Sequence, residues 1–235
     1  MIQCVHPLRL RCVMLELIDI RVRLQSKAGA VNILRGTTVA AQAGQSVAVT
    51  GRSGSGKTTL LMVAAGLLRP DSGRVLALGE DLTRKSEDEL AAFRRRRVGV
   101  VFQSFHLLPN MTALENAALP LEFAGRADAL DAAGAALARL GLGERLHHYP
   151  GELSGGEQQR AAIARAFAAS PSIILADEPT GNLDSATGAD VADTLFSLCA
   201  EKNTCLLLVT HDASLAARCD RRVVLADGLV VEAAG

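Results

Sequence analysis

Hydrophobic residues along the chain follow two alternating patterns, short apolar runs and longer stretches with helical spacing. The short runs are rich in β-branched residues and leucine and are bounded by turn or charged residues, so they predict buried strands at 46–50, 98–102, 173–176, 206–210 and 223–226. The longer Ala- and Leu-rich stretches predict helices at 58–68, 156–169 and 189–198. Strands that alternate with helices are typical of a parallel sheet packed by helices, so the predicted fold class is α/β.

One region interrupts this alternation. Residues 111–146 contain two or three helical patterns and no convincing strand. We therefore expect a helical lobe, at about residues 104–165, inserted into the sheet-bearing part of the chain. The four arginines at 94–97 could form a patch for anionic lipid or nucleic acid, but the pattern favours the solvated end of a helix that leads into strand 98–102.

A glycine-rich loop lies between the first predicted strand and the helix that follows it. Its sequence, GRSGSGKT at 51–58, matches the phosphate-binding pattern G-x-x-x-x-G-K-[ST] in the strand–loop–helix context that this pattern requires. Glycines let the backbone turn its N–H groups toward phosphate oxygens, and the start of the helix adds the positive end of its dipole. The predicted nucleotide-binding residues are Gly51, Arg52, Ser53, Gly54, Ser55, Gly56, Lys57, Thr58 and Thr59.

Two acidic residues end the strand predicted at 173–176. Asp177 is suited to a Mg²⁺ shell together with the Thr58 hydroxyl, and Glu178 could orient and deprotonate a water molecule that attacks the γ-phosphate. Acidic pairs at strand ends are more often turn or cap residues. The phosphate-binding loop upstream is what favours catalysis here, because the carboxyl ends of parallel strands lie at one edge of a sheet.

The sequence LSGGEQQR at 153–160 has a serine followed by two glycines at the start of a predicted helix. Ser154, Gly155 and Gly156 offer a hydroxyl and open amides for a γ-phosphate, although Ser154 and Glu157 are also compatible with an ordinary capping box. Here the chain resembles the ABC transporter ATPase family through its signature motif. The resemblance implies a P-loop NTPase core with a parallel-rich sheet, an antiparallel N-terminal β part, an inserted helical lobe, and hydrolysis of ATP.

Further positions match the family in order and spacing, although a lone Gln or His at a strand end is more often structural. By the resemblance, Gln103 contacts Mg²⁺ and senses the membrane partner, His211 contacts the γ-phosphate, and Asp184 links two sites. The family also implies a head-to-tail homodimer, in which the signature of one subunit faces the phosphate-binding loop of the other across two bound ATP molecules.

Within the family, residues 101–123 and the sequence ADEPTGNLD resemble the lipoprotein-release and macrolide-export branch. This implies an integral-membrane permease as a separate partner, and a peripheral position on the cytoplasmic face of the inner (cell) membrane. Four apolar residues would line the groove that receives a permease helix, or could equally belong to the core of the helical lobe: Phe102, Phe105, Leu107 and Leu108.

One position departs from the family pattern. Most members carry an aromatic residue that stacks on adenine about twenty-five positions before the phosphate-binding loop, and residues 20–25 here offer only Leu24. Adenine would then lose a stacking contribution of roughly 1 kcal/mol. We therefore expect weak discrimination between bases.

Composition narrows the partners. Lys plus Arg and Asp plus Glu are equal at 25 each, so the basic surplus of a nucleic-acid-binding chain is missing and no nucleic acid is expected. Five cysteines without CxxC spacing predict reduced, mostly packed thiols. The longest apolar run, at 60–68, is too short to cross a membrane. Met14 opens an apolar pattern, so residues 1–13 are expected to be a disordered extension or a misplaced start that precedes the ATP-binding domain at 14–235.

Three other classes share parts of these motifs. A DNA-repair or chromosome-organising ATPase would place long heptad coiled coils between loop and signature, and none occurs here. A ribosome-associated member would carry two such domains and a basic linker. A simple P-loop kinase has no use for the signature or for a histidine after the last parallel strand.

Overall fold

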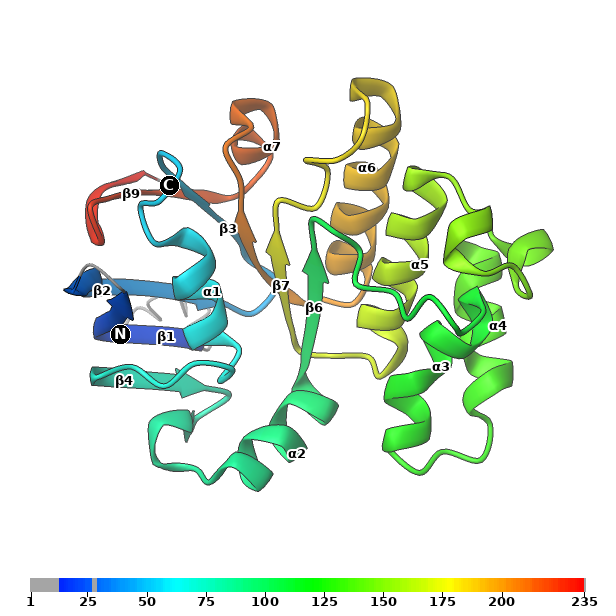
Figure 1. The fold of residues 1–235 in the computed structure, drawn as a ribbon, viewed down its shortest axis with the longest axis horizontal. Coiled ribbons are helices and arrows are strands. Elements are labelled where there is room, and N and C mark those ends of the chain that lie inside the picture. The colour runs from blue at the N-terminus through cyan, green and yellow to red at the C-terminus, as the bar shows by residue number, and fades with distance from the viewer. Residues whose placement is uncertain (1–12, 27–28, 235) are drawn as a thin grey trace, which may run out of the picture.

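The computed structural model describes residues 13–26 and 29–234, and it confirms the predicted α/β class. Two sheets lie beside a helical lobe (Figure 1). The four-stranded sheet has the order β2-β1-β4-β5 and is antiparallel, with strands β1 (Val13–Ser26), β2 (Gly29–Gln42), β4 (Ser72–Ala77) and β5 (Glu80–Asp81). Of the extension expected at 1–13, only Val13 lies within the described residues, and it begins β1.

The second sheet has six strands in the order β10-β9-β3-β8-β7-β6, and its neighbours are parallel except for the β9–β10 pair. All five predicted strands belong to this sheet. Strands of a parallel sheet are covered on both faces, so their sequences are continuous apolar runs that are easily recognised. The strands are β3 (Ser46–Thr50), β6 (Val98–Phe102), β7 (Ile173–Asp177), β8 (Cys205–Val209), β9 (Arg221–Ala226) and β10 (Leu229–Ala234).

The helices begin where side chains cap them. Capping boxes start α2, α3 and α5, in which Ser86, Thr112 and Ser154 pair with a glutamate three residues later. The α-helices are α1 (Lys57–Ala64), α2 (Glu87–Arg97), α3 (Ala113–Phe123), α4 (Ala129–Arg139), α5 (Gly155–Ala168), α6 (Ser185–Glu201) and α7 (Ala213–Ala217). Single 3₁₀ turns occur at Leu82–Arg84, Gly143–Arg145 and Pro150–Glu152.

The apolar side chains form separate clusters. One fills the space between the antiparallel sheet, α1 and one face of the parallel sheet, and a second lies between the opposite face, α5 and α6. The third belongs to α3, α4 and α5. That third cluster gives residues 113–168 a core of their own, as expected for an inserted helical lobe. In the described part of the chain, no helix is long and apolar enough to cross a membrane.

The structure bears on two predictions about individual side chains, those for the arginines at 94–97 and for the cysteines. The arginines at 94–97 form the last turn of α2, which leads directly into β6 as predicted. Cys199 and Cys205 are buried free thiols, and burial raises the pKa of each to about 12, which fits packing rather than reactivity. Cys4 and Cys12 lie outside the described residues.

Candidate nucleotide site

The loop at 51–56 connects β3 to α1 and is shaped by glycines. Gly51 has φ 150° and Gly56 has φ 101°, backbone conformations that side-chain-bearing residues rarely adopt. A Cβ on Gly51 would lie 2.1 Å from the carbonyl oxygen of Leu225, and a Cβ on Gly56 would lie 2.9 Å from that of Ile33. Neighbouring strands β9 and β2 therefore approach the loop too closely for any other residue.

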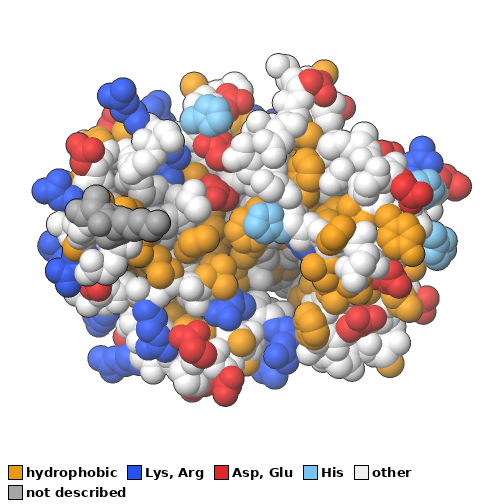
Figure 2. Space-filling model, viewed as in Figure 1, with side chains coloured by type: hydrophobic (Ala, Val, Ile, Leu, Met, Phe, Trp, Pro, Cys, Tyr) orange, Lys and Arg blue, Asp and Glu red, His pale blue; other side chains and the backbone are white. Residues whose placement is uncertain are grey.

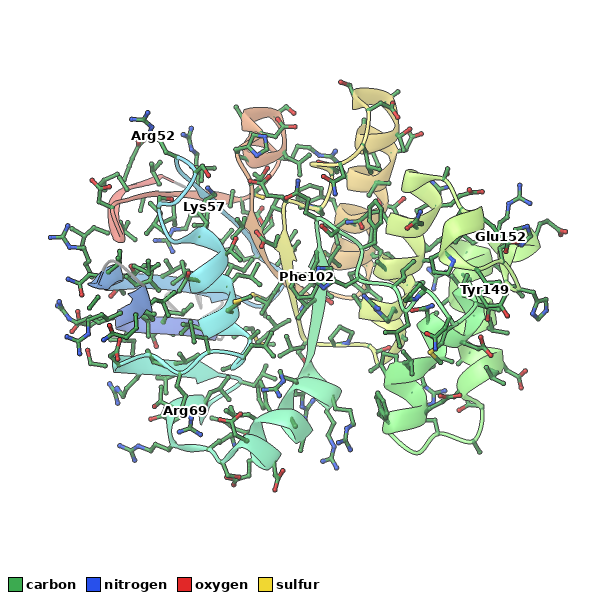
Figure 3. The ribbon with its side chains drawn as sticks, viewed as in Figure 1. Arg52, Lys57, Arg69, Phe102, Tyr149 and Glu152 are labelled. Carbon is green, nitrogen blue, oxygen red and sulfur yellow. The ribbon has the colours of Figure 1, made fainter. Side chains whose placement is uncertain are left out.

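This loop forms one wall of a cavity of about 700 Å³. Lys57, the first residue of α1, donates to the backbone oxygens of Gly51 (2.9 Å) and Arg52 (3.1 Å), so its ammonium lies over the loop. Figure 3 shows Arg52 and Lys57 together at this end of the molecule. The described residues that line the cavity are Ile33, Gly51, Arg52, Ser53, Gly54, Gly56, Lys57, Thr58, Thr59, Gln103, Asp177, Glu178, Val209 and His211.

Two oxygen-bearing side chains that could bind a metal lie together in the lining of the cavity, those of Thr58 and Asp177. The Thr58 hydroxyl donates to Asp177 Oδ1 at 3.3 Å, and Asp177 ends β7. Burial raises the pKa of Asp177, Glu178 adds to that rise, and the Thr58 hydroxyl and Lys57 oppose it. A carboxylate and a hydroxyl with room for waters and phosphate oxygens form the kind of donor set that Mg²⁺ accepts. The chemistry of these residues therefore fits the predicted metal.

Glu178 follows Asp177 with a left-handed backbone, φ 46°, fixed by its N–H donating to the Val209 oxygen of β8 at 2.9 Å. Its carboxylate lies against the residues that follow β8. Thr210 Oγ1 donates to Glu178 Oε2 at 3.2 Å, the His211 N–H donates to the same oxygen at 3.3 Å, and His211 Nδ1 lies 2.8 Å from Oε1. The candidate base and the candidate histidine are therefore in direct contact.

Gln103 lies at the edge of the same cavity, directly after β6. Its side-chain Nε2 donates to Asn182 Oδ1 at 2.9 Å, and Asn182 Nδ2 donates to the backbone carbonyl oxygen of Gln103 at 3.0 Å. This reciprocal pair ties the end of β6 to the turn that precedes α6. Gln103 is thus oriented by a residue four positions after Glu178.

The signature residues lie elsewhere in the chain. Ser154 is the N-cap of α5, and it accepts from Glu157 N at 3.3 Å while its own N–H donates to Glu157 Oε2 at 2.8 Å, so the capping-box reading holds. A Cβ on Gly156 would lie 2.4 Å from Thr187 Cγ2, so any larger residue would have to displace the Thr187 side chain where α5 packs against the start of α6. In Figure 1, α1 and α5 lie on opposite sides of β6 and α6, so α5 is well apart from the phosphate-binding loop that precedes α1.

Asp184 also has a local partner. It is the N-cap of α6 and accepts from Ala186 N at 3.1 Å and from Thr187 N at 3.0 Å. The side chain of Thr187 above all, and then these backbone bonds, lower the pKa of Asp184. Among the described residues that line the cavity, neither Asp184 nor any of Ser154, Gly155 and Gly156 occurs. One chain therefore brings together only part of the predicted site.

Sequence reasoning missed several residues around the cavity. Ile33 of β2 lines it, whereas Leu24 of β1 is not among its lining residues within the described chain and is 43% exposed. Thr210, which holds the Glu178 carboxylate, is 1% exposed. A buried threonine that follows a strand of five apolar residues and precedes the histidine was the available signal for a polar partner, because buried hydroxyls are hydrogen-bonded.

The fold and this cavity define a P-loop nucleotide-hydrolysing domain, with a strand–loop–helix phosphate site and two acidic residues at the end of a neighbouring parallel strand. The family model described as "ABC transporter" matches residues 34–181. The chain belongs to the ABC transporter family. It is an ATP-binding and ATP-hydrolysing subunit of the branch that contains the lipoprotein-releasing and macrolide-export ATPases.

Three relatives support this assignment. The uncharacterized ABC transporter ATP-binding protein YbbA of Escherichia coli K12 is 50% identical over 206 residues, 87% of this chain and 90% of that protein. The lipoprotein-releasing system ATP-binding protein LolD of Geobacter metallireducens is 47% identical over 93% of this chain and 98% of its own. The macrolide export ATP-binding/permease protein MacB of Syntrophobacter fumaroxidans is 45% identical over 94% of this chain and 32% of its own length.

The fold also matches solved structures of ABC transporter cassettes. The dimeric structure of MJ0796, a bacterial ABC transporter cassette, superimposes with a TM-score of 0.88 at 37% identity, over 94% of this chain and 98% of that one. A post-hydrolysis state of the same cassette, bound to ADP and Pi, gives the same TM-score at 36% identity. The predicted fold, with its antiparallel N-terminal β part, is therefore confirmed over the 94% of the chain that superimposes.

Proposed function

We propose that this chain hydrolyses ATP at a site shared between two copies and thereby drives a separate membrane permease. The observation that carries the proposal is the convergence of the phosphate-binding loop, Asp177, Glu178 and His211 on one cavity, while Ser154 of the signature lies outside it. The loop amides and Lys57 would bind the phosphates. Thr58, Asp177 and Gln103 would hold Mg²⁺, which neutralises phosphate charge when it is bound.

Glu178 would act as the general base. Its carboxylate already has a fixed orientation, because Thr210 and His211 hold both oxygens from one short segment after β8. A general base needs such an orientation to accept a proton from a water placed in line with the γ-phosphate. His211 would contact the γ-phosphate from the same side, so its contact with Glu178 would adjust to the presence of nucleotide.

A second copy would complete the site. Ser154, Gly155 and Gly156 stand at the N-terminus of a fourteen-residue helix, α5, whose open amides and dipole favour an anion. In a twofold dimer, each of these N-termini would face the phosphate-binding loop of the partner, and Asp184 would lie between the two sites. ATP would stabilise the dimer because it contacts both copies.

The permease would dock in a groove of about 590 Å³ between α2, α3 and α5. Figure 2 shows a hollow here, with hydrophobic side chains around it and Lys or Arg side chains on its rim. Its lining includes Leu119, Pro120 and Phe123 of α3 together with Arg94 and Arg95 of α2 and Arg165 of α5, and of its described lining residues none is acidic. An amphipathic helix with an acidic side chain, from a cytoplasmic loop of the permease, matches this apolar and basic lining.

The four residues expected to form this groove are placed differently. Leu107 packs against the core of the helical lobe, Leu108 is 43% exposed, and neither they nor Phe102 and Phe105 line the groove. Phe102 instead stacks on His106, with ring centroids 4.6 Å apart. We therefore propose Leu119, Pro120 and Phe123, further along the chain on α3, as the apolar docking residues.

We expect Phe123→Glu to abolish association with the permease while leaving ATP hydrolysis by the isolated chain within about twofold of wild type. Phe123 is 68% exposed at the end of α3, so the substitution costs little stability, but a carboxylate would repel the acidic helix and remove an apolar contact. The measurement is co-purification from membranes with the membrane protein encoded by the neighbouring reading frame.

Leu130→Glu is the matched control. Leu130 is a 48%-exposed apolar residue of the same lobe, on α4, and it does not line the groove. It should leave association unchanged. Normal association of Phe123→Glu, or equal loss in both variants, would contradict the assignment of the groove to the permease.

The relatives named for lipoprotein release and macrolide export suggest what the permease handles. We propose that the complex moves an amphiphilic or hydrophobic cargo by transmitting force to envelope components, with this chain peripheral on the cytoplasmic face of the inner (cell) membrane. A permease with four spanning helices and a large extracytoplasmic domain in the neighbouring reading frame would support this. A many-helix channel would oppose it.

Base selectivity should be low. Leu24 and Ile33 are both aliphatic, so ATP and GTP would be held chiefly through phosphates and Lys57, and we expect their affinities to differ by less than about tenfold, or 1.4 kcal/mol. Leu24→Tyr should tighten ATP binding by up to about 1 kcal/mol if residue 24 reaches the base. Titration of both nucleotides against wild type and variant measures this.

Val13→Tyr serves as its control, because Val13 lies at the opposite end of β1 from Leu24 and is similarly exposed at 48%. It should change nucleotide affinity little. A strong preference for ATP that Leu24→Tyr leaves unchanged would show that another residue, with Ile33 first in line, holds the base.

A further inference from the structure

Helix α5 holds the chain on both sides of Gln103. Before Gln103, Gln159 Nε2 donates to the Phe102 oxygen at 3.3 Å. After it, Arg165 Nη2 donates to the Phe105 oxygen at 2.9 Å and Arg165 Nη1 donates to the His106 oxygen at 2.6 Å. Two side chains from one helix therefore fix the ends of the short segment that places Gln103 at the nucleotide cavity.

The segment held by Arg165 has an uncommon backbone. Phe105 has φ 59° and His106 has φ 52°, so two successive non-glycine residues lie in the left-handed region. Such conformations persist only where surrounding contacts impose them. The forked guanidinium bonds to both carbonyls in question, and the His106 ring closes the turn by stacking on Phe102. The conformation after Gln103 thus depends on Arg165.

Arg165 also lines the docking groove, together with Arg94 and Arg95. One side chain therefore faces the proposed permease helix and bonds to the backbone two and three residues beyond Gln103. Gln159 connects the same helix, α5, to Pro179, the residue after Glu178. It is fully buried, its Nε2 also donates to the Pro179 oxygen at 2.6 Å, and its Oε1 has no partner among the described residues.

We propose that Arg165, assisted by Gln159, positions Gln103 for ATP hydrolysis by fixing the backbone on both sides of it. This inference rests on the proposed role of Gln103 at the nucleotide. Loss of the two bonds from the Arg165 guanidinium would let the left-handed turn at Phe105 and His106 relax and would move Gln103. A mere brace between α5 and β6 would instead affect stability without acting through Gln103.

The test is a double-mutant cycle on ATP hydrolysis by the full chain with Mg²⁺. Arg165→Lys keeps the charge, but one ammonium cannot replace a planar fork that bonds to two carbonyls. We expect kcat to fall about tenfold, with KM for ATP within about twofold of wild type. In the Gln103→Ala background, Arg165→Lys should change kcat by less than about twofold, because the residue through which it acts is gone.

Two further variants separate positioning from folding. Arg139→Lys, at an exposed arginine of α4 that pairs with Glu201 at 2.7 Å, should leave kcat unchanged in both backgrounds. Phe105→Asn should recover at least about half of the activity lost in Arg165→Lys, because asparagine adopts the left-handed region more readily than an aromatic residue and the stacking of His106 on Phe102 is kept. Thermal unfolding of each variant reports whether it is folded.

The outcomes are distinct. An equal fall in kcat for Arg165→Lys with and without Gln103, or no recovery by Phe105→Asn, would show a structural brace and overturn the inference alone. A Gln103→Ala variant with wild-type kcat would remove Gln103 from the site, and both the proposed role of Gln103 and the inference would fail.

Discussion

Glu178→Gln is expected to bind Mg-ATP as well as wild type, to lose hydrolysis by about 10²- to 10⁴-fold, and to accumulate as a nucleotide-bound dimer. The amide has the shape of the carboxylate and can still accept from Thr210 and the His211 N–H, which lie 3.2 and 3.3 Å from Oε2. It cannot accept the proton of the attacking water. Binding and dimer formation should therefore proceed while the chemical step stops.

Steady-state hydrolysis and size-exclusion chromatography with ATP measure the two effects together. Glu201→Gln is the matched control, because Glu201 is an exposed glutamate at the end of α6 that pairs with Arg139, far from the cavity. It should hydrolyse ATP normally. His211→Ala should also lower turnover, whereas Lys57→Ala should weaken nucleotide binding. A wild-type rate in Glu178→Gln would show that another group is the base.

The parallel strands were predictable because their sequences carry the whole signal. β3 and β6 occupy the predicted residues, since a central strand is covered on both faces and needs an unbroken apolar run. The β8 strand begins one residue earlier than predicted. Its register with β7, in which Cys205 pairs with Ile173, decides that boundary, and register is a property of the assembled sheet.

The first helix shows where apolar pattern misleads. The run at 58–68 predicts a helix to residue 68, yet α1 ends at Ala64. Gly66 adopts φ 63°, and the N–H groups of Leu67 and Leu68 both donate to the Met62 oxygen, which closes the helix. Leu68 then packs against the core from outside the helix. Hydrophobic spacing alone does not distinguish a core residue on a helix from one just after it.

The candidate site likewise contains residues that the sequence could place and contacts that it could not. Lys57, Thr58 and Asp177 belong to local motifs, so their positions at one sheet edge follow from strand order. The bonds from Arg165 to the carbonyls beyond Gln103 join residues about sixty positions apart, and their existence depends on how the helical lobe packs. Distance along the chain points to Leu24 near the base, whereas Ile33 of β2 lines the cavity in the structure, and only the fold of β1 and β2 shows this.

Ser154→Arg is expected to abolish the cooperative rise of hydrolysis with protein concentration. If each site is completed by a partner, the rate of the dilute wild-type chain should increase more steeply than linearly, because dimers form by mass action. An arginine at the start of α5 would place bulk where the partner's phosphates must bind. Specific activity measured over a dilution series, with sizing at each concentration, gives the result.

Thr112→Arg controls for the lost cap. Ser154 and Thr112 both cap a helix of the same lobe through a capping box, so each substitution removes about 1 kcal/mol of helix stabilisation. Only Ser154 belongs to the signature. Thr112→Arg should therefore keep the steep concentration dependence, and a similar loss in both variants would attribute the effect to folding of the lobe.

Mixing two inactive variants tests the shared site most directly. A heterodimer of Ser154→Arg with Lys57→Ala has one site in which the intact loop of the first chain faces the intact signature of the second. Random pairing would place at most about a quarter of the wild-type number of complete sites in such a mixture. We expect activity in the mixture that neither variant has alone. Constant specific activity of wild type down to concentrations where only monomer is present, together with an inactive mixture, would contradict a site built from two chains.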